Sequence, residues 1–233
     1  RDLHSFPTRR SSDLTNVIPV DRQISEMISL HQNVSESKAL EMAGDMLEVV
    51  GIMRERGNEY PHQFSGGMKQ RVVIAIALAC NPMLLIADEP TTALDVTIQA
   101  QVLKLMRNLK AKYDTSMIMI THDLGIVAEM CDKVAIMYAG RVVEYASTQQ
   151  LFEDPRHPYT EGLFNSLPDI EEEQERLKVI QGLMPDPTNL PSGCCFHPRC
   201  PYAIESCSVL EPAMFEAAPG HFSACPVRGG NGR

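Results

Sequence analysis

The sequence lacks the features that mark several large classes of protein. Its longest apolar run, Val72 to Cys80, falls far short of the ~18 residues that a membrane-spanning helix requires. It shows no secretory signal pattern and no internal repeat. Lys and Arg number 21 against 30 Asp and Glu, and the net charge of −9 argues against nucleic acid as the main partner. We therefore expect a soluble chain that reaches any membrane through partner subunits.

The composition suits a globular fold. With 233 residues, 44% of them apolar, the chain can form one large domain, or one domain with a small appendage. Residues 1–14 fit nothing that follows, since they are basic and show no helical or strand period. We interpret them as a non-native sequencing scar, with a disordered native tail as the alternative.

The stretch from Met83 to Asp95, MLLIADEPTTALD, organises the chain. Its apolar start predicts a strand over residues 83–87 that is buried on both faces and ends at the carboxylates of Asp88 and Glu89. Pro90 forces this ending, so that both side chains can reach one site. Carboxylates at the carboxyl end of a parallel strand lie where open sheets bind ligands. Taken alone, the pair could also be a solvated acidic turn.

Three further segments accompany this strand. Residues 64–71 (FSGGMKQR) lie upstream, Leu94 and Asp95 follow the strand, and residues 121–123 (THD) come after a second predicted buried strand, 116–120. In this order and at this spacing, the segments resemble the signature motif, Walker B strand, D-loop and switch histidine of ABC-transporter ATPases. The resemblance implies an α/β fold of the P-loop type, with ATP and Mg²⁺ as cofactors.

The resemblance implies a role for each matching residue. Asp88 would hold Mg²⁺, Glu89 would act as general base on the attacking water, and His122 would contact the γ-phosphate. The other nucleotide-binding positions would be Ser65, Gly66, Gly67, Gln70 and Asp95. In ABC ATPases the signature motif contacts ATP that the other subunit holds, so a head-to-tail dimer is implied.

Helical patterns surround these motifs. Residues 15–65 are predicted as a helical subdomain, in which one helix begins after Ser35 and ends at Gly51. A buried helix over residues 67–80 would offer free N–H groups and glycines to a phosphate at its start; an ordinary N-cap at Ser65 is the alternative.

The remaining part of the predicted ATPase core spans residues 66–146 and contains the Walker B, D-loop and switch-histidine segments. Asp95 is expected to cap the helix that follows it, as well as to lie at the dimer seam. Residues 133–138 and 141–145, joined by Ala139 and Gly140, predict a closing β-hairpin.

Composition changes after Ser147, since eleven of the 16 prolines lie beyond it. The segments 152–167 (FEDPRHPYTEGLFNSL) and 191–200 (PSGCCFHPRC) resemble the C-terminal region of the dipeptide/oligopeptide importer ATPases. We therefore predict an importer-type extension, rich in proline and cysteine, over residues 147–233. The resemblance covers nearly all of residues 15–227.

Five of the seven cysteines lie in the last forty residues. Structural zinc sites usually show paired short spacings, which are missing here, and disulfides are rare in cytoplasmic proteins. Some family members carry a [4Fe-4S] centre in this region, which the resemblance offers as a further interpretation. Its ligands would be Cys194, Cys200, Cys207 and Cys225, with Cys195 as a spare and His221 as a possible substitute. Zinc, or no metal, remains the alternative.

One expected element is missing. The loop Gly-x₄-Gly-Lys-Ser/Thr, which holds the phosphates of ATP, occurs nowhere in the sequence. We therefore interpret the chain as the C-terminal part of a nucleotide-binding subunit that lacks the N-terminal Walker A part. Because Asp88 and Glu89 have no phosphate cradle beside them, we expect the chain alone to bind ATP very weakly.

The function that these patterns predict is an ATP-hydrolysing subunit that energises import of di- or oligopeptides, peripheral on the cytoplasmic face of the cell membrane. Its expected partners are a second ATPase subunit (itself or a paralogue), two transmembrane permease subunits and, indirectly, an extracytoplasmic peptide-binding protein. Alternatives are a non-hydrolytic regulatory half that contributes the signature face and a metal cluster, or a soluble ABC ATPase without a transport role. Dipeptides, longer peptides and nickel all stay open as substrates.

Overall fold

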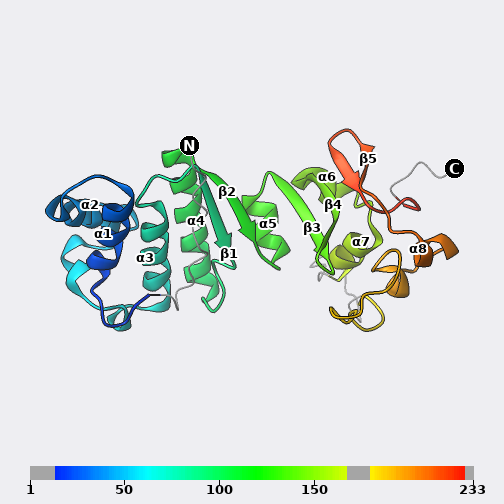
Figure 1. Ribbon diagram of the computed structural model, residues 1–233, viewed down its shortest axis with the longest axis horizontal. Coiled ribbons are helices and arrows are strands. Elements are labelled where there is room, and N and C mark those ends of the chain that lie inside the picture. Colours follow the sequence, from blue (N-terminus) through cyan, green and yellow to red (C-terminus); the bar gives the residue numbers. More distant parts are fainter. Residues whose placement is uncertain (1–13, 167–178, 229–233) are drawn as a thin grey trace. The chain divides into compact units, whose positions relative to one another are not determined.

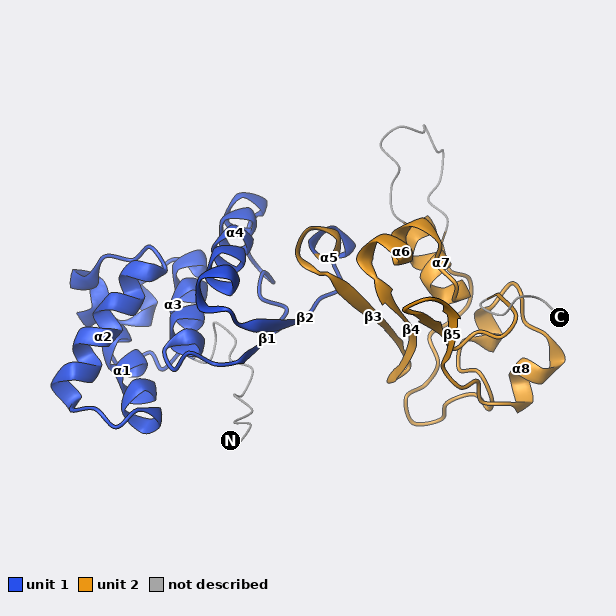
Figure 2. Ribbon diagram, turned by 90° about the horizontal axis from the view of Figure 1, so that it is seen from above, with its two compact units in different colours: residues 1–126 blue, residues 127–233 orange. Residues whose placement is uncertain are grey.

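A computed structural model of the chain describes residues 14–166 and 179–228 (Figure 1). The segment interpreted as a scar lies outside the described residues, except for Leu14. The chain forms two compact units, residues 1–126 and 127–233 (Figure 2). Among the described residues, no helix is long and apolar enough to cross a bilayer.

Unit 1 is mainly helical. Its helices are α1 (Val20–His31), α2 (Glu36–Val49), the short 3₁₀ helices η2 (Arg54–Asn58) and η3 (Pro61–Gln63), α3 (Gly66–Leu78) and α4 (Val96–Tyr113). Helix α1 packs on α2, and α3 packs on α4 as well as on α1 and α2. Helix α3 buries residues on all sides, as the sequence predicts. The apolar stripes of α2 and α4 also face the core, with Ala39, Leu47, Val102 and Met106 buried.

Local chemistry fixes both ends of α2. At its start, the Ser35 hydroxyl accepts a hydrogen bond from the Lys38 N–H. At its end, Gly51 has a φ of 77°, a left-handed conformation that glycine adopts without strain. The Gly51 N–H donates to the carbonyl of Glu48, and the next N–H donates to that of Leu47. This pair of bonds is a Schellman motif, so the predicted helix start and stop are both confirmed.

The sheet of unit 1 pairs β1 (Leu84–Asp88) in parallel with β2 (Ser116–Ile120). The prediction that both strands are buried on both faces is wrong. Leu85 and Met117 lie against α3 and α4, whereas Ile118 and Ile120 on the opposite face are each 49% exposed. The reason is that α3 and α4 cover only one face of this two-stranded sheet in the described part of the chain. The short helix α5 (Leu124–Met130) follows β2.

Unit 2 is built on a sheet of order β3-β4-β6-β5, all of whose neighbours are antiparallel. Its strands are β3 (Lys133–Tyr138), β4 (Arg141–Ser147), β5 (Phe215–Ala218) and β6 (His221–Ser223). Ala139 and Gly140, with φ of 48° and 78°, form the turn that joins β3 to β4. Two positive φ values are typical of a type I′ hairpin turn, and the predicted hairpin is confirmed.

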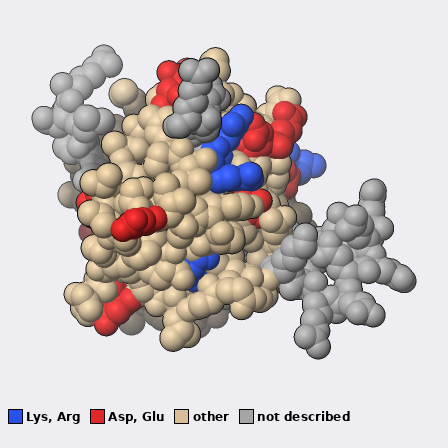
Figure 3. All heavy atoms as spheres, turned by 90° about the vertical axis from the view of Figure 1, so that its right-hand side faces the viewer, with Lys and Arg blue, Asp and Glu red and all other residues tan. Residues whose placement is uncertain are grey.

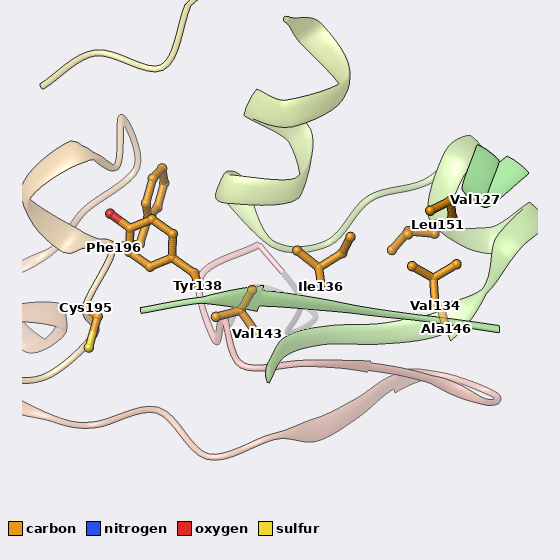
Figure 4. Packing of buried hydrophobic residues seen from close by; sticks show 9 residues of the cluster. All are labelled: Val127, Val134, Ile136, Tyr138, Val143, Ala146, Leu151, Cys195 and Phe196. Carbon is orange, nitrogen blue, oxygen red and sulfur yellow. The ribbon is translucent and has the colours of Figure 1, made fainter. Parts of the chain in front are cut away.

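Short helices flank this sheet: α6 (Thr148–Glu153), α7 (Pro158–Asn165), the 3₁₀ helix η4 (His197–Arg199) and α8 (Glu205–Val209). The core of unit 2 joins side chains of the β3–β4 hairpin to Leu151 and to Phe196 from the distant C-terminal segment (Figure 4). Tyr138 meets Phe196 edge to face, with ring centroids 5.2 Å apart.

The division between the units differs from the change of composition after Ser147. Strand β4 pairs with β6 through Glu144 and Tyr145, so the hairpin shares one sheet with the C-terminal segment. Composition cannot show such a pairing, because it joins residues almost eighty positions apart. The predicted assignment of residues 66–146 and 147–233 to functional parts stays a prediction.

Candidate functional site

The start of α3 offers backbone N–H groups to a ligand. Ser65 is the N-cap, and its hydroxyl accepts a hydrogen bond from the Met68 N–H. The first intrahelical bond runs from the Lys69 N–H to the Ser65 carbonyl, so the N–H groups of Gly66 and Gly67 precede the helical ladder. Such N–H groups, together with the helix dipole, favour an anion at this end. Gln70 lies half-buried one turn further along α3.

The two glycines differ in their surroundings. Gly66 is exposed, and a Cβ placed on it would lie 3.6 Å from Leu94 Cδ2, an ordinary contact. Gly67 is buried, and a Cβ there would lie only 2.3 Å from Ile98 Cγ2. Gly67 therefore lets the first turns of α3 and α4 approach closely. The sequence predicts both glycines as ligand-contacting, and the geometry gives Gly67 a packing role.

Close packing of these turns brings two helix N-termini together. The Asp95 carboxylate caps α4 by accepting a hydrogen bond from the Ile98 N–H at 3.0 Å. The expected capping role of Asp95 is thus confirmed. Because Leu94 and Ile98 contact the start of α3, the predicted D-loop lies against the predicted signature motif. The positive ends of two helix dipoles consequently meet on one side of unit 1.

The carboxylates of Asp88 and Glu89 lie at the end of β1. Asp88 is the last residue of the strand, paired with Ile120, and is half-buried. Glu89 follows with a φ of 45°, and its N–H donates to the Ile120 carbonyl at 2.8 Å. Ala93 in the same turn has a φ of 63°. Positive φ in residues other than glycine costs about 1–3 kcal/mol each and is concentrated at functional sites.

The Glu89 side chain is held at both oxygens. Its Oε1 lies 3.2 Å from Nδ1 of His122, and its Oε2 accepts a hydrogen bond of 2.8 Å from the Thr92 hydroxyl. Because an ionised carboxylate only accepts, Nδ1 of His122 supplies the proton of the first contact. The structure thus brings together the predicted general base and the predicted switch histidine. Both remain open to solvent, with side chains 46% and 82% exposed.

His122 is carried on a tight turn between β2 and α5. The Thr121 hydroxyl accepts a hydrogen bond from the Asp123 N–H, and the Asp123 carboxylate accepts from the N–H groups of Gly125 and Ile126. These bonds fix the backbone on both sides of His122. The imidazole is therefore carried on an ordered turn and is exposed to solvent.

Sequence reasoning overlooks Thr92, because a threonine in a turn is usually only a turn residue. The sequence signal for a contact with Glu89 is the position of Thr92, three residues later in the same turn. In this turn, the Thr92 N–H donates to the Glu89 carbonyl while its hydroxyl donates to the Glu89 carboxylate. Thr92 therefore orients the predicted base from its own turn.

A separate cavity of about 220 Å³ lies in unit 2. The four cysteines predicted as metal ligands all line it: Cys194, Cys200, Cys207 and Cys225. Burial, together with the proximity of the other three thiols, raises the pKa of the Cys200 thiol to about 11. Burial also raises the pKa of Cys194. Cys195 is buried in the hydrophobic core instead (Figure 4).

Within the described residues, no group of three or more His, Cys, Asp or Glu side chains is arranged to hold a metal ion. This finding disfavours a single ion such as zinc. A four-iron cluster places each thiolate on a different iron, so its ligands stand further apart than those of one ion. The end of unit 2 that carries α8 has few charged side chains over much of its surface (Figure 3). The finding does not support the predicted cluster either, which stays a prediction that rests on the four cysteines lining one cavity.

Histidine 221, the predicted substitute ligand, is engaged elsewhere. Its Nε2 lies 2.7 Å from the Glu144 carboxylate, and both side chains are almost completely buried. The same carboxylate accepts hydrogen bonds from the N–H groups of Arg156 and His157, at 2.6 and 2.9 Å. Glu144 thus ties β4 to β6 and to the loop before α7. His157, which the sequence does not single out, lines the cysteine cavity.

Two family profiles match the sequence. The profile "ABC transporter" matches residues 2–92, and "Oligopeptide/dipeptide transporter, C-terminal region" matches residues 143–207. A solved structure with a similar fold is "Dimeric structure of a post-hydrolysis state of the ATP-binding cassette MJ0796 bound to ADP and Pi". It has a TM-score of 0.53 and 24% identity, and covers 60% of this chain and 61% of that chain. This likeness shows an ABC ATPase fold of mixed α/β type.

Curated relatives are much more similar in sequence. The chain is 50% identical over 216 residues to "Oligopeptide transport ATP-binding protein AppD" of Bacillus subtilis, which covers 92% of this chain and 66% of that protein. It is 49% identical over 216 residues to "Oligopeptide transport ATP-binding protein OppD" of Escherichia coli, covering 92% and 64%. A "Probable peptide ABC transporter ATP-binding protein" of Sinorhizobium fredii is 52% identical over 217 residues, covering 92% and 65%. The chain thus spans just under two thirds of the length of these relatives.

Proposed function

Since this chain belongs to the ABC transporter family and carries the C-terminal region of its oligopeptide/dipeptide branch, we propose that it acts in an ATP-hydrolysing subunit of a peptide importer. The observation that carries the proposal is the contact of 3.2 Å between Glu89 and His122 at the carboxyl end of β1 and β2. A carboxylate at this edge can act as general base on the attacking water, with the imidazole beside it placed to contact the phosphate.

Each residue at the end of β1 and β2 would have a separate role in ATP hydrolysis. Glu89 orients the attacking water and accepts its proton, while Thr92 keeps the carboxylate turned towards the site. Without nucleotide, His122 donates through Nδ1 to Glu89; with ATP bound, this N–H would instead donate to the γ-phosphate. Asp88 would hold Mg²⁺, which supplies charge neutralisation on the phosphates when bound.

The N-termini of α3 and α4 would contact a second ATP molecule, which the partner ATPase holds. Ser65, Gly66 and the α3 N–H groups would face the γ-phosphate of ATP held by a partner ATPase, with Asp95 at the seam between the subunits. The adjacent α4 N-terminus adds its dipole to the same place, so negative charge is favoured there. Each subunit of the dimer would therefore complete the other's site.

The wider assembly follows from the relatives, whose names describe oligopeptide transport and a peptide ABC transporter. We propose a partner ATPase, either a second copy or a paralogue, and two transmembrane permease subunits as direct partners. A peptide-binding protein would act on the outer side. The subunit would then be cytoplasmic and bound peripherally to the membrane through the permease.

The cysteine cavity suggests a resident cofactor in the importer-type extension. We propose that Cys194, Cys200, Cys207 and Cys225 hold a [4Fe-4S] cluster, because all four line one cavity whose walls are mostly apolar. Such a cluster supplies redox chemistry or a rigid cross-link when bound. In the free protein, burial keeps the pKa of Cys200 high, so its thiol is protonated at neutral pH.

The test uses a full-length subunit that contains this sequence together with a phosphate loop, assembled with a partner ATPase and permease from the same source. We expect Ser65→Arg to abolish hydrolysis at the partner's nucleotide site, because a bulky cation would fill the phosphate-facing end of α3. Glu89→Gln tests this chain's own site. A loss of about 100-fold or more in each variant supports two working sites. If only Ser65→Arg reduces turnover, the chain is a non-hydrolytic half that contributes the signature face; if neither does, the proposed function is refuted.

A second experiment concerns the chain alone. Because the sequence contains no Gly-x₄-Gly-Lys-Ser/Thr loop, we expect calorimetric titration with ATP and Mg²⁺ to show only very weak binding. Tight binding would contradict the interpretation that this chain lacks its phosphate cradle. Asp88→Asn is the matched control, since it removes the expected magnesium ligand without adding bulk.

A further inference from the structure

We propose that His157 is the hydrogen-bond donor of the cysteine cavity, and that its Nε2–H donates to a sulfur of the metal centre held there. The inference rests on the cluster proposed above and assigns it a positioning residue outside its ligand set. His157 and a second histidine, His197, both line the cavity together with the four cysteines.

The backbone contact of His157 fixes which nitrogen carries the proton. Nδ1 of His157 accepts a hydrogen bond of 3.1 Å from the Tyr159 N–H. An accepting nitrogen has no proton, so the neutral ring carries its only proton on Nε2. A doubly protonated ring would carry a proton on both nitrogens and could not accept this bond, so the ring is neutral in this arrangement. His157 therefore has one donor group left, and cannot act as a ligand through Nε2 without losing it.

His197 has the opposite arrangement. Its Nδ1 lies 2.9 Å from the Cys194 carbonyl oxygen, and a carbonyl can only accept, so Nδ1 carries the proton. In the neutral ring, Nε2 of His197 is then an acceptor and cannot donate to a sulfur. Of the two cavity histidines, His157 is therefore the one suited to stabilise negative charge on a thiolate or a bridging sulfide.

The surroundings hold His157 in place. The residue is 1% exposed, and its ring lies 5.9 Å from that of Phe196. Its backbone N–H donates to the buried carboxylate of Glu144, which also contacts His221 on β6. A buried N–H group is costly without an acceptor, and water has little access here. These contacts orient the ring before any metal centre is assembled, which is the condition for a donor to influence that centre strongly.

The expected effect is on the reduction potential. Hydrogen bonds to the sulfurs of an iron–sulfur cluster stabilise its reduced, more negative state and so raise its potential. Removing the His157 donor should shift the one-electron reduction equilibrium about tenfold towards the oxidised state, which corresponds to about 59 mV.

Two substitutions separate the donor from the structural role. His157→Asn keeps an oxygen that can cap α7 in place of Nδ1, but does not reach the position of Nε2. His157→Gln places an amide N–H near the position of Nε2. After anaerobic reconstitution of the whole chain with iron and sulfide, we expect both variants to show the visible absorption of the cluster. The potential should be lowered in H157N and restored towards the wild-type value in H157Q.

Each outcome decides a different point. Equal potentials in the wild type and in both variants, with the cluster assembled, would overturn the role of His157 and leave the cluster standing. Failure of the wild-type chain to assemble a cluster would refute the cluster, and the role of His157 with it, while the ATPase proposal keeps its own test with Ser65 and Glu89. If H157N does not fold, His157→Ser replaces it. Serine also caps helices, but its side chain is too short to donate a hydrogen bond at the position of Nε2.

Discussion

A methyl group added at Gly67 should destabilise the protein, whereas the same change at its neighbour Gly66 should not. A Cβ at Gly67 would lie 2.3 Å from Ile98 Cγ2, so the first turns of α3 and α4 would have to separate. Overpacking of this kind costs about 1–3 kcal/mol, and alanine recovers at most about 1 kcal/mol through its higher helix propensity. We expect Gly67→Ala to lower the free energy of unfolding by about 1–2 kcal/mol.

Gly66 provides the matched control. A Cβ there would meet Leu94 Cδ2 at 3.6 Å, which is an ordinary contact, so only the gain in propensity remains. Gly66→Ala should therefore be neutral or stabilise the chain by about 0.5 kcal/mol. Urea denaturation followed by circular dichroism measures both, and the two midpoints should differ by the equivalent of about 2 kcal/mol.

A double-mutant cycle tests the stated cause. Ile98→Ala removes the methyl group that would clash, so Gly67→Ala should cost much less in that background, with a coupling energy of about 1–2 kcal/mol. If Gly67→Ala and Gly66→Ala have equal effects, or if the cycle shows no coupling, the packing role of Gly67 is refuted. In that case a ligand-contacting role would be the only remaining reason for glycine at this position.

Three further predictions concern single residues. Asp95→Ala should destabilise the protein by about 1 kcal/mol in thermal unfolding, because α4 loses its cap, while Asp95→Asn should retain most of the stability. Gly193→Ala should disrupt the cysteine cavity and expose its thiols to a colorimetric thiol reagent, since Gly193 has a φ of 67° and a Cβ would lie 2.4 Å from the Cys207 carbonyl; unchanged thiol reactivity would contradict this. Because burial lowers the pKa of His157 from 6.5 to about 4, the folded state resists its protonation, and stability that is present above pH 6.5 should be lost as the pH falls towards 4. The loss should approach about 3 kcal/mol in the wild type and be much smaller in H157N; parallel pH curves for the two would argue against a buried neutral imidazole.

The sequence predicts most accurately the features that neighbouring residues determine. Ser35 and Asp95 cap helices because a side chain and a backbone N–H only three positions away suffice to form the bond. Ala139 and Gly140 form a turn for the same local reason. The proximity of Glu89 and His122 is also predictable, because parallel strands that end in polar residues bring them to one sheet edge.

Features that depend on distant segments are not predictable in this way. The apolar runs of β1 and β2 suggest complete burial, but burial depends on what covers each face, and a run of side chains carries no information about that. Gly67 looks like a phosphate-contacting glycine until Ile98, thirty-one positions later, is placed beside it. Likewise, Glu144 and His221 meet only because β4 and β6 share a sheet, so their contact cannot be predicted from the sequence.

The sheet of unit 1 also determines how the isolated chain should behave in solution. Within the described residues, β1 and β2 pair only with each other, so both are edge strands of this sheet. The adjoining face exposes Leu84, Ile118 and Ile120. Exposed aliphatic edge strands promote strand addition between molecules, which the net charge of −9 opposes only while the ionic strength is low. Light scattering by the purified chain should therefore increase with both protein and salt concentration, and a charged substitution such as Ile118→Lys should suppress that increase.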